Sequence, residues 1–175
     1  MKNEVRRKGK PSYKRCAFTD HRPQKLPFGF DEQDPRCIDF KQRIREAVER
    51  LINNGYAHFI SGGAMGMDTF AAETVLELKE QYPWILLEMV SPFDGQADKW
   101  TQEYRARHDR LFRDADIVTV IDHEYKPSSM FRRNRYLVDN ADLLLAAFDG
   151  QPGGTKMTVD YAAENGIQVE RIQIN

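Results

Sequence analysis

The chain has 175 residues, of which 41% are hydrophobic and 30% are charged, and its formal net charge is −1. This length suits one globular domain. The near-neutral net charge gives no argument for nucleic-acid binding and none against a local basic patch. The two cysteines have no CxxC spacing, and the sequence shows neither a secretory signal nor an apolar run of about 18 residues. We therefore expect a reduced, cytoplasmic protein, and the scattered histidines predict no metal site.

Residues 1–13 are basic and polar without hydrophobic periodicity, which predicts a flexible tail; the alternative is an arm that binds nucleic acid or a partner. From residue 14 onward, short apolar segments alternate with segments of helical period. We expect strands at 14–18, 57–61, 84–93, 116–122, 142–150 and 168–175. We expect helices at 38–55, 66–83, 97–115, 128–141 and 154–166. This alternation predicts a single doubly wound α/β domain over residues 14–175, with a mainly parallel sheet flanked by helices.

In such a domain ligands bind beyond the carboxyl ends of the strands, so the loops that follow the strands are the places to search. The loop “SGGAMGMD” joins a strand to a helix and contains Ser61, Gly62, Gly63, Gly66 and Asp68. Its glycines and the helix start offer backbone amides to a phosphate. The motif is neither GxGxxG nor a Walker loop, and a tight turn with Asp68 in the first helical turn is the alternative.

The loop “DGQPGGT” has the same character, because Gly153, Gly154 and Thr155 precede a helix. The alternative is an ordinary loop in which Thr155 caps the helix. If both glycine-rich loops face one crevice, they can hold opposite sides of one phosphorylated ligand, which is the interpretation we favour.

The loop after the first strand, “FTDHRPQKLPF”, offers Thr19, His21 and Arg22 as ligand-binding residues, with Lys25 in support. An arginine can neutralise a phosphate through two parallel hydrogen bonds. The alternative for Arg22 is an ion pair with a surface carboxylate, and His21 is expected to form hydrogen bonds rather than act as a base.

Two further loops contribute candidates. Phe93 and Gln96 in “SPFDGQ” are expected to stack on a base and to hydrogen-bond a ligand, with core packing as the alternative for Phe93. Arg133 and Asn134 in “MFRRNRYLVDNAD” lie near the start of a predicted helix. Only one or two side chains of that basic run can face a ligand, and a solvated charge run is the alternative.

Taken together, “FTDHRPQKLPF”, “SGGAMGMD”, “PFDGQADKW”, “RNRYLVDNADLLLAAFDG” and “GGT” resemble the SLOG superfamily, and within it the small bacterial YpsA-like proteins. The superfamily includes the DNA-processing protein DprA (Smf) and the LOG phosphoribohydrolases. The resemblance implies a Rossmann-like fold, a nucleotide-derived ligand and a homo-oligomer. Asp20 stands where the YpsA-like pattern has glycine, and a carboxylate there would repel a phosphate. The resemblance therefore implies that this loop does not contact phosphate, that the ligand differs or that binding is weaker.

The resemblance also bears on catalysis. LOG enzymes use an arginine and a glutamate to cleave an N-glycosidic bond. Arg133 falls at the arginine position, whereas Thr158 falls at the glutamate position, or Asp160 in a shifted frame. A threonine cannot stabilise the oxocarbenium-like charge of that reaction. The catalytic residues are therefore unknown, with Arg133 and Asp68 as candidates.

We expect the domain to bind a ligand of the NAD, ADP-ribose or nucleoside-monophosphate class, and the sequence identifies no cofactor. One alternative is an N-glycosidic hydrolase of nucleoside monophosphates or NAD-like substrates. The second alternative is a single-stranded nucleic-acid-binding module resembling DprA.

Overall fold

The computed structural model describes residues 13–20 and 22–174. The predicted tail, apart from Tyr13, and the predicted ligand residue His21 lie outside the described residues. Six strands form one sheet in the order β4-β3-β2-β1-β5-β6, and every neighbouring pair is parallel. The strands are β1 (Lys14–Asp20), β2 (Tyr56–Ser61), β3 (Leu86–Phe93), β4 (Ile117–Asp122), β5 (Leu143–Ala147) and β6 (Gln168–Arg171).

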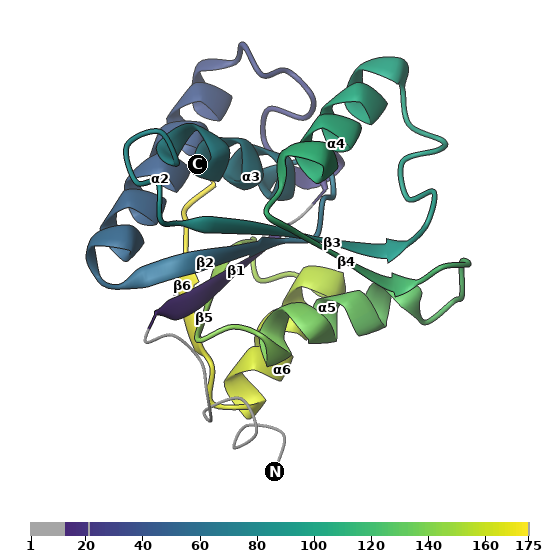
Figure 1. Ribbon diagram of the computed structural model, residues 1–175. Helices are drawn as coiled ribbons and strands as arrows, with labels where there is room; N and C mark the ends of the chain where they lie inside the picture. The colour runs from purple at the N-terminus through teal and green to yellow at the C-terminus, as the bar shows by residue number, and fades with distance from the viewer. Residues whose placement is uncertain (1–12, 21, 175) are drawn as a thin grey trace.

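The helices cover both faces of this sheet, with α2, α3 and α4 on one face and α5 and α6 on the other (Figure 1). They are the short 3₁₀ helix η1 (Pro23–Lys25), α2 (Pro35–Asn53), α3 (Met67–Leu78), α4 (Gln102–Asp114), α5 (Ser129–Asp139) and α6 (Gly154–Glu164). The predicted doubly wound α/β domain is confirmed. No helix in the described part of the chain combines the length and the apolarity that crossing a membrane requires.

Each face of the sheet carries its own hydrophobic core, because successive side chains of a strand such as β1 point to opposite faces. Phe18 packs with Phe40 and Phe59 on the α2–α4 side, whereas Ala17 packs with Leu137 on the α5–α6 side. The central strands therefore have no solvated face, as their continuous apolar sequences predict.

The topology also fixes the position of a binding edge. From β1 the chain moves outward through β2, β3 and β4, and it then returns to place β5 on the other side of β1. The strand order therefore reverses beside β1, and the crevice at the carboxyl end of such a switch point is where open α/β sheets bind ligands.

Two helices begin at least three residues away from their predicted starts. Helix α2 begins at Pro35 instead of residue 38, because the Asp34 carboxylate accepts a hydrogen bond of 2.8 Å from the Arg36 amide and proline fits the first helical turn. Helix α4 begins at Gln102 instead of residue 97, with Thr101 as its N-terminal cap. The preceding residues form turns, so the predicted helix was too long at this end.

Candidate functional site

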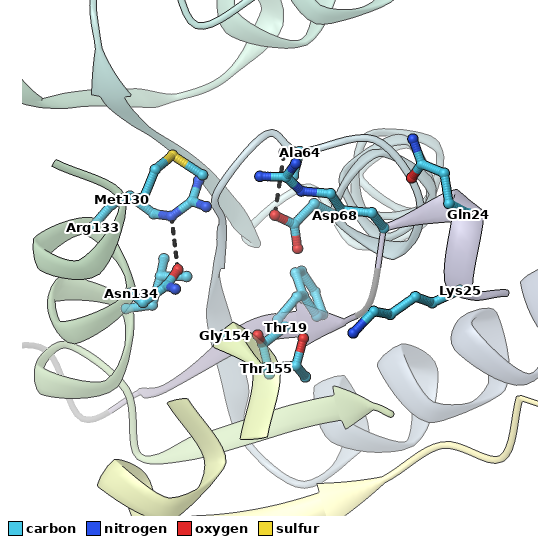
Figure 2. Close-up of a pocket in the computed structure, with 13 residues that line it drawn as sticks. Thr19, Gln24, Lys25, Ala64, Asp68, Met130, Arg133, Asn134, Gly154 and Thr155 are labelled. Carbon is cyan, nitrogen blue, oxygen red and sulfur yellow. Dashed lines mark hydrogen bonds between the residues drawn. The ribbon is translucent and has the colours of Figure 1, made fainter. Parts of the chain in front are cut away.

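A cavity of about 530 Å³ lies at the carboxyl edge of the sheet, at the switch point beside β1 (Figure 2). Its walls come from β1 and η1, from the turn between β2 and α3 with the first turn of α3, from α5 and from the start of α6. The structure brings these predicted residues together in the walls: Thr19, Arg22, Lys25, Asp68, Arg133, Asn134, Gly154 and Thr155. Protein cavities that bind small molecules commonly have volumes of this order.

Asp68 is the carboxylate of the cavity, and 5% of the residue is exposed. Its Oδ2 accepts a hydrogen bond of 3.2 Å from the Ala64 amide, which Figure 2 shows. Its Oδ1 is buried and has no hydrogen-bond partner among the described residues. Burial raises the pKa of Asp68, while the charge of Arg133 opposes that shift. The backbone amides of Ala64 and Gly62 also oppose the rise in this pKa. The cavity therefore contains a buried carboxyl whose Oδ1 has no partner in good hydrogen-bond geometry among the described residues.

Arg133 is the most buried cation of the cavity, with 4% of the residue exposed. Its Nη1 donates to the Gly62 carbonyl oxygen, and its Nε donates to Asn134 Oδ1 over 3.0 Å. Burial lowers the pKa of Arg133, and the charge of Asp68 counteracts that effect. These contacts hold the guanidinium in one position.

The first glycine-rich turn already uses several of its donors within the protein. The Gly63 amide donates to Ser61 Oγ over 3.2 Å, and the Ser61 hydroxyl donates to the Asp68 carbonyl over 2.9 Å. Gly63 has a φ of +73°, and a Cβ there would lie 2.9 Å from Cε2 of Phe112. Gly63 therefore packs against α4 on the face of the turn that points away from the cavity. The next amide, that of Ala64, donates to Asp68.

The other glycines of this turn also have structural partners. Gly62 accepts from Arg133 and also from Gln96 Nε2, over 3.2 Å. Gly66, with a φ of +97°, forms the N-terminal cap of α3. Gln96 in turn contacts His108 on α4 over 3.0 Å, so it lies behind the turn and does not line the cavity.

Phe93 also lies outside the cavity walls. Its ring packs edge-on against Tyr125, with 5.1 Å between the centroids. Asp20, the departure from the family pattern, pairs through its backbone with Ala147 of β5. The carboxyl end of β1 is therefore continuous with the sheet up to the cavity.

The second glycine-rich turn opens directly on the cavity. Gly153 caps α6, and the space around a Cβ on Gly154 is empty to 4 Å. Lys25 Nζ would lie 3.5 Å from a Cβ on Gly153, and in Figure 2 it points towards Gly154 and Thr155. Within residues 13–20 and 22–174, neither Lys25 nor Arg22 forms an ion pair. Two cations without a carboxylate partner in those ranges therefore accompany a helix N-terminus.

Helix α6 contributes no carboxylate to this cavity. The Thr158 hydroxyl donates back to the Gly154 carbonyl over 2.9 Å. Asp160 pairs at the surface with Lys156 over 2.6 Å. Neither alignment of the glutamate position therefore places an acid here. In the described part of the chain, no group of three or more His, Cys, Asp or Glu side chains is arranged to hold a metal.

Sequence reasoning missed Gln24, Ala64 and Met130, which also line the cavity. Met130 precedes Arg133 by one helical turn, and this spacing would have placed both on the same face of α5. Gln24 follows Pro23, whose ring favours the short helix that carries Gln24 beside Lys25. No comparable signal marks Ala64.

Comparisons with known proteins agree with this architecture. A UPF0398 protein of Bacillus pumilus (strain SAFR-032) is 28% identical over 151 residues, which cover 85% of this chain and 81% of the relative. The SPbeta prophage-derived protein YoqJ of Bacillus subtilis (strain 168) is 28% identical over 156 residues, which cover 80% of this chain and 91% of the relative.

Solved structures of DNA processing protein A share the fold. The proteins from Helicobacter pylori and Streptococcus pneumoniae each superpose with a TM-score of 0.59 at 18% identity, over 90% and 91% of this chain. This chain spans only 64% and 50% of those two chains. The model of the family YpsA, described as the YspA SLOG family, matches residues 16–174. Because this match covers nearly the whole sequence, the chain belongs to the YspA SLOG family.

Proposed function

We propose that this domain binds a nucleotide or nucleotide-derived molecule, with a phosphate of the ligand at the N-terminus of α6. The observation that carries the proposal is the placement of Lys25 and Arg22, which lack carboxylate partners in the described chain, in the same cavity wall as Gly154. A positive helix end and two cations without carboxylate partners in the described ranges are together the elements of an anion site.

The nucleoside would then extend towards Asp68. The unused Oδ1 of this carboxylate is an acceptor for a ribose hydroxyl or a base amino group, and leaving it without a partner is costly in a buried site. The amides of Gly63 and Ala64 already bind Ser61 and Asp68. The first glycine-rich turn therefore acts by positioning Asp68, and the phosphate is directed to the second turn.

Calorimetry with AMP tests this proposal. Wild type should bind AMP, and Lys25→Ala should weaken binding about tenfold, the cost of one charge-assisted hydrogen bond. The matched control is Lys99→Ala, because Lys99 is an exposed lysine outside the cavity walls. Absence of AMP binding, or equal losses in the two variants, would overturn the proposal.

A hydrolase is the second candidate, and the raised pKa of Asp68 favours it. A raised pKa favours a carboxyl as the general acid that donates a proton to a leaving base. The test is chromatography for free adenine after incubation with AMP. Release that is lost in Asp68→Asn, with AMP binding retained, supports hydrolysis; no release at high enzyme concentration rejects it.

A single-stranded nucleic-acid module is the third candidate. The Helicobacter pylori DNA processing protein A, which shares the fold, binds single-stranded DNA. Binding of a DNA strand through phosphates would weaken steeply with salt, by a slope that grows with the number of phosphate contacts. Fluorescence anisotropy across salt concentrations measures that slope, and a flat response would exclude this function.

A further inference from the structure

A second cavity of about 470 Å³ lies between α5 and α6 and adjoins the first. The two cavities share Met130, Asn134 and Gly154 in their walls. Gly154 has no side chain, and the space around a Cβ at this position is empty to 4 Å. The boundary at the start of α6 is therefore bare backbone, and a phosphate held there has access to both cavities.

The second cavity offers a flat surface suited to a base. Phe131 is 44% exposed and Met157 is 57% exposed, although both are apolar. The Arg135 guanidinium lies 4.5 Å from the centroid of Phe131 and 4.7 Å from that of Tyr161. An exposed ring beside a planar cation is a surface on which nucleobases stack.

The charges of this cavity favour a base over a second phosphate. Arg135 forms no ion pair with any residue in 13–20 or 22–174. Asp160 and Glu164 lie in the same walls, and their carboxylates would repel a phosphate. Carboxylates accept hydrogen bonds from the amino groups of bases or from ribose hydroxyls.

We propose that the cavity between α5 and α6 is a nucleoside subsite, so that the ligand contains two nucleosides joined through phosphate. This inference rests on the proposed function, because the shared phosphate occupies the start of α6. A mononucleotide would fill the cavity of Asp68 and leave the exposed surface of Phe131 and Met157 uncovered. A second nucleoside covers that surface, and the shared wall at Gly154 allows the linkage to pass.

Calorimetry with three ligands tests the subsite: AMP, NAD with its pyrophosphate link, and the phosphodiester-linked dinucleotide pdApdA. At least one dinucleotide should bind about tenfold more tightly than AMP, and which one does so identifies the linkage. Phe131→Ala and Met157→Glu should remove this advantage while AMP affinity stays within about twofold. Trp84→Ala is the matched control, because Trp84 is an exposed aromatic residue outside both cavities.

The outcomes separate the two proposals. If AMP fails to bind, the proposed function fails. If AMP binds but neither dinucleotide binds more tightly, only the subsite is overturned. The apolar surface could instead be covered by a second copy of the chain, and light scattering, which measures the oligomeric state, tests this alternative. If Phe131→Ala dissociates an oligomer and leaves the dinucleotide advantage intact, the surface is an interface between copies and the subsite is rejected.

Discussion

The Gly62 carbonyl oxygen accepts a hydrogen bond from the guanidinium of Arg133, which lies directly against the Gly62 backbone. A Cβ on Gly62 would lie 2.7 Å from Arg133 Cζ, well inside van der Waals contact. This glycine is therefore required for the approach of an arginine side chain. The turn between β2 and α3 holds two ionisable groups of the cavity in place, Arg133 through Gly62 and Asp68 through Ala64.

Gly62→Ala should displace Arg133 and destabilise the domain. The added methyl cannot fit beside the guanidinium, and overpacking of this kind costs about 1–3 kcal/mol. Urea denaturation followed by circular dichroism measures the loss. AMP affinity should fall in the same variant, because the buried cation leaves its position.

Gly154→Ala is the matched control for this change. The space around its Cβ is empty and its φ is not positive, so alanine should leave stability unchanged or raise it by about 0.4–1 kcal/mol. Equal unfolding free energies for Gly62→Ala and wild type would contradict the role given to Gly62.

The pKa of Asp68 predicts a dependence of stability on pH. Burial raises this pKa from its ordinary value of 3.8, so the folded chain favours the protonated carboxyl. The resulting stability is fully present below pH 3.8 and is lost as the pH rises through the folded-state pKa. Relative to Asp68→Asn, wild type should therefore lose unfolding free energy as the pH rises above 3.8.

Urea denaturation of both proteins at several pH values between about 4 and 8 measures this difference. Between pH 3.8 and the folded-state pKa, the loss should approach about 1.4 kcal/mol per pH unit, the value for one proton. A constant difference across the range, or one that favours wild type at higher pH, would show that Asp68 is not held in its protonated form by burial.

A second buried carboxylate, Glu88, lies on β3 away from the cavity. It contacts His58 over 2.9 Å and accepts from Tyr136 over 2.7 Å and from Thr119 over 3.2 Å. Burial alone would raise the pKa of Glu88, but hydrogen bonds from His58 and Tyr136 hold it below its ordinary value. These contacts join β2, β3, β4 and α5.

Tyr136→Phe should therefore cost about 1.5–3 kcal/mol, the contribution of a buried hydrogen bond to a charged group. Tyr161→Phe is a close control, because its hydroxyl donates to the exposed Asp139 over 2.8 Å. That variant should cost at most about 0.5 kcal/mol. Thermal denaturation of the two variants compares them directly, and equal losses would contradict the special role of the buried network.

Sequence reasoning identified much of the fold, because short apolar runs such as 143–147, alternating with longer segments of helical period, predict strands buried on both faces. It also placed Thr19, Arg22 and Gly154 near one another, since parallel strands end at the same edge. The structural role of Gly62 could not be predicted from the strand order or from the residues around it in sequence. It depends on Arg133, which lies 71 residues away and reaches the turn only in the folded chain.

The position of Gln96 has the same explanation. Its place in the loop after β3 predicted a ligand contact, but its amide contacts Gly62 and His108, two partners from different parts of the sequence. The start of α4 depended on the cap at Thr101, and the helical period alone does not reveal a cap. The roles of these glycines and polar loop residues thus depend on contacts with residues that are distant in the sequence.

The central claim is that a phosphate lies at the start of α6. Calorimetry of AMP and adenosine with wild type and Gly154→Asp tests it most directly. The new aspartate occupies open space and is favourable in a first helical turn, so the variant should fold. We predict that wild type binds AMP about tenfold more tightly than adenosine and that Gly154→Asp abolishes this preference. Equal affinities of wild type for the two ligands, or an unchanged preference in Gly154→Asp, would contradict the claim.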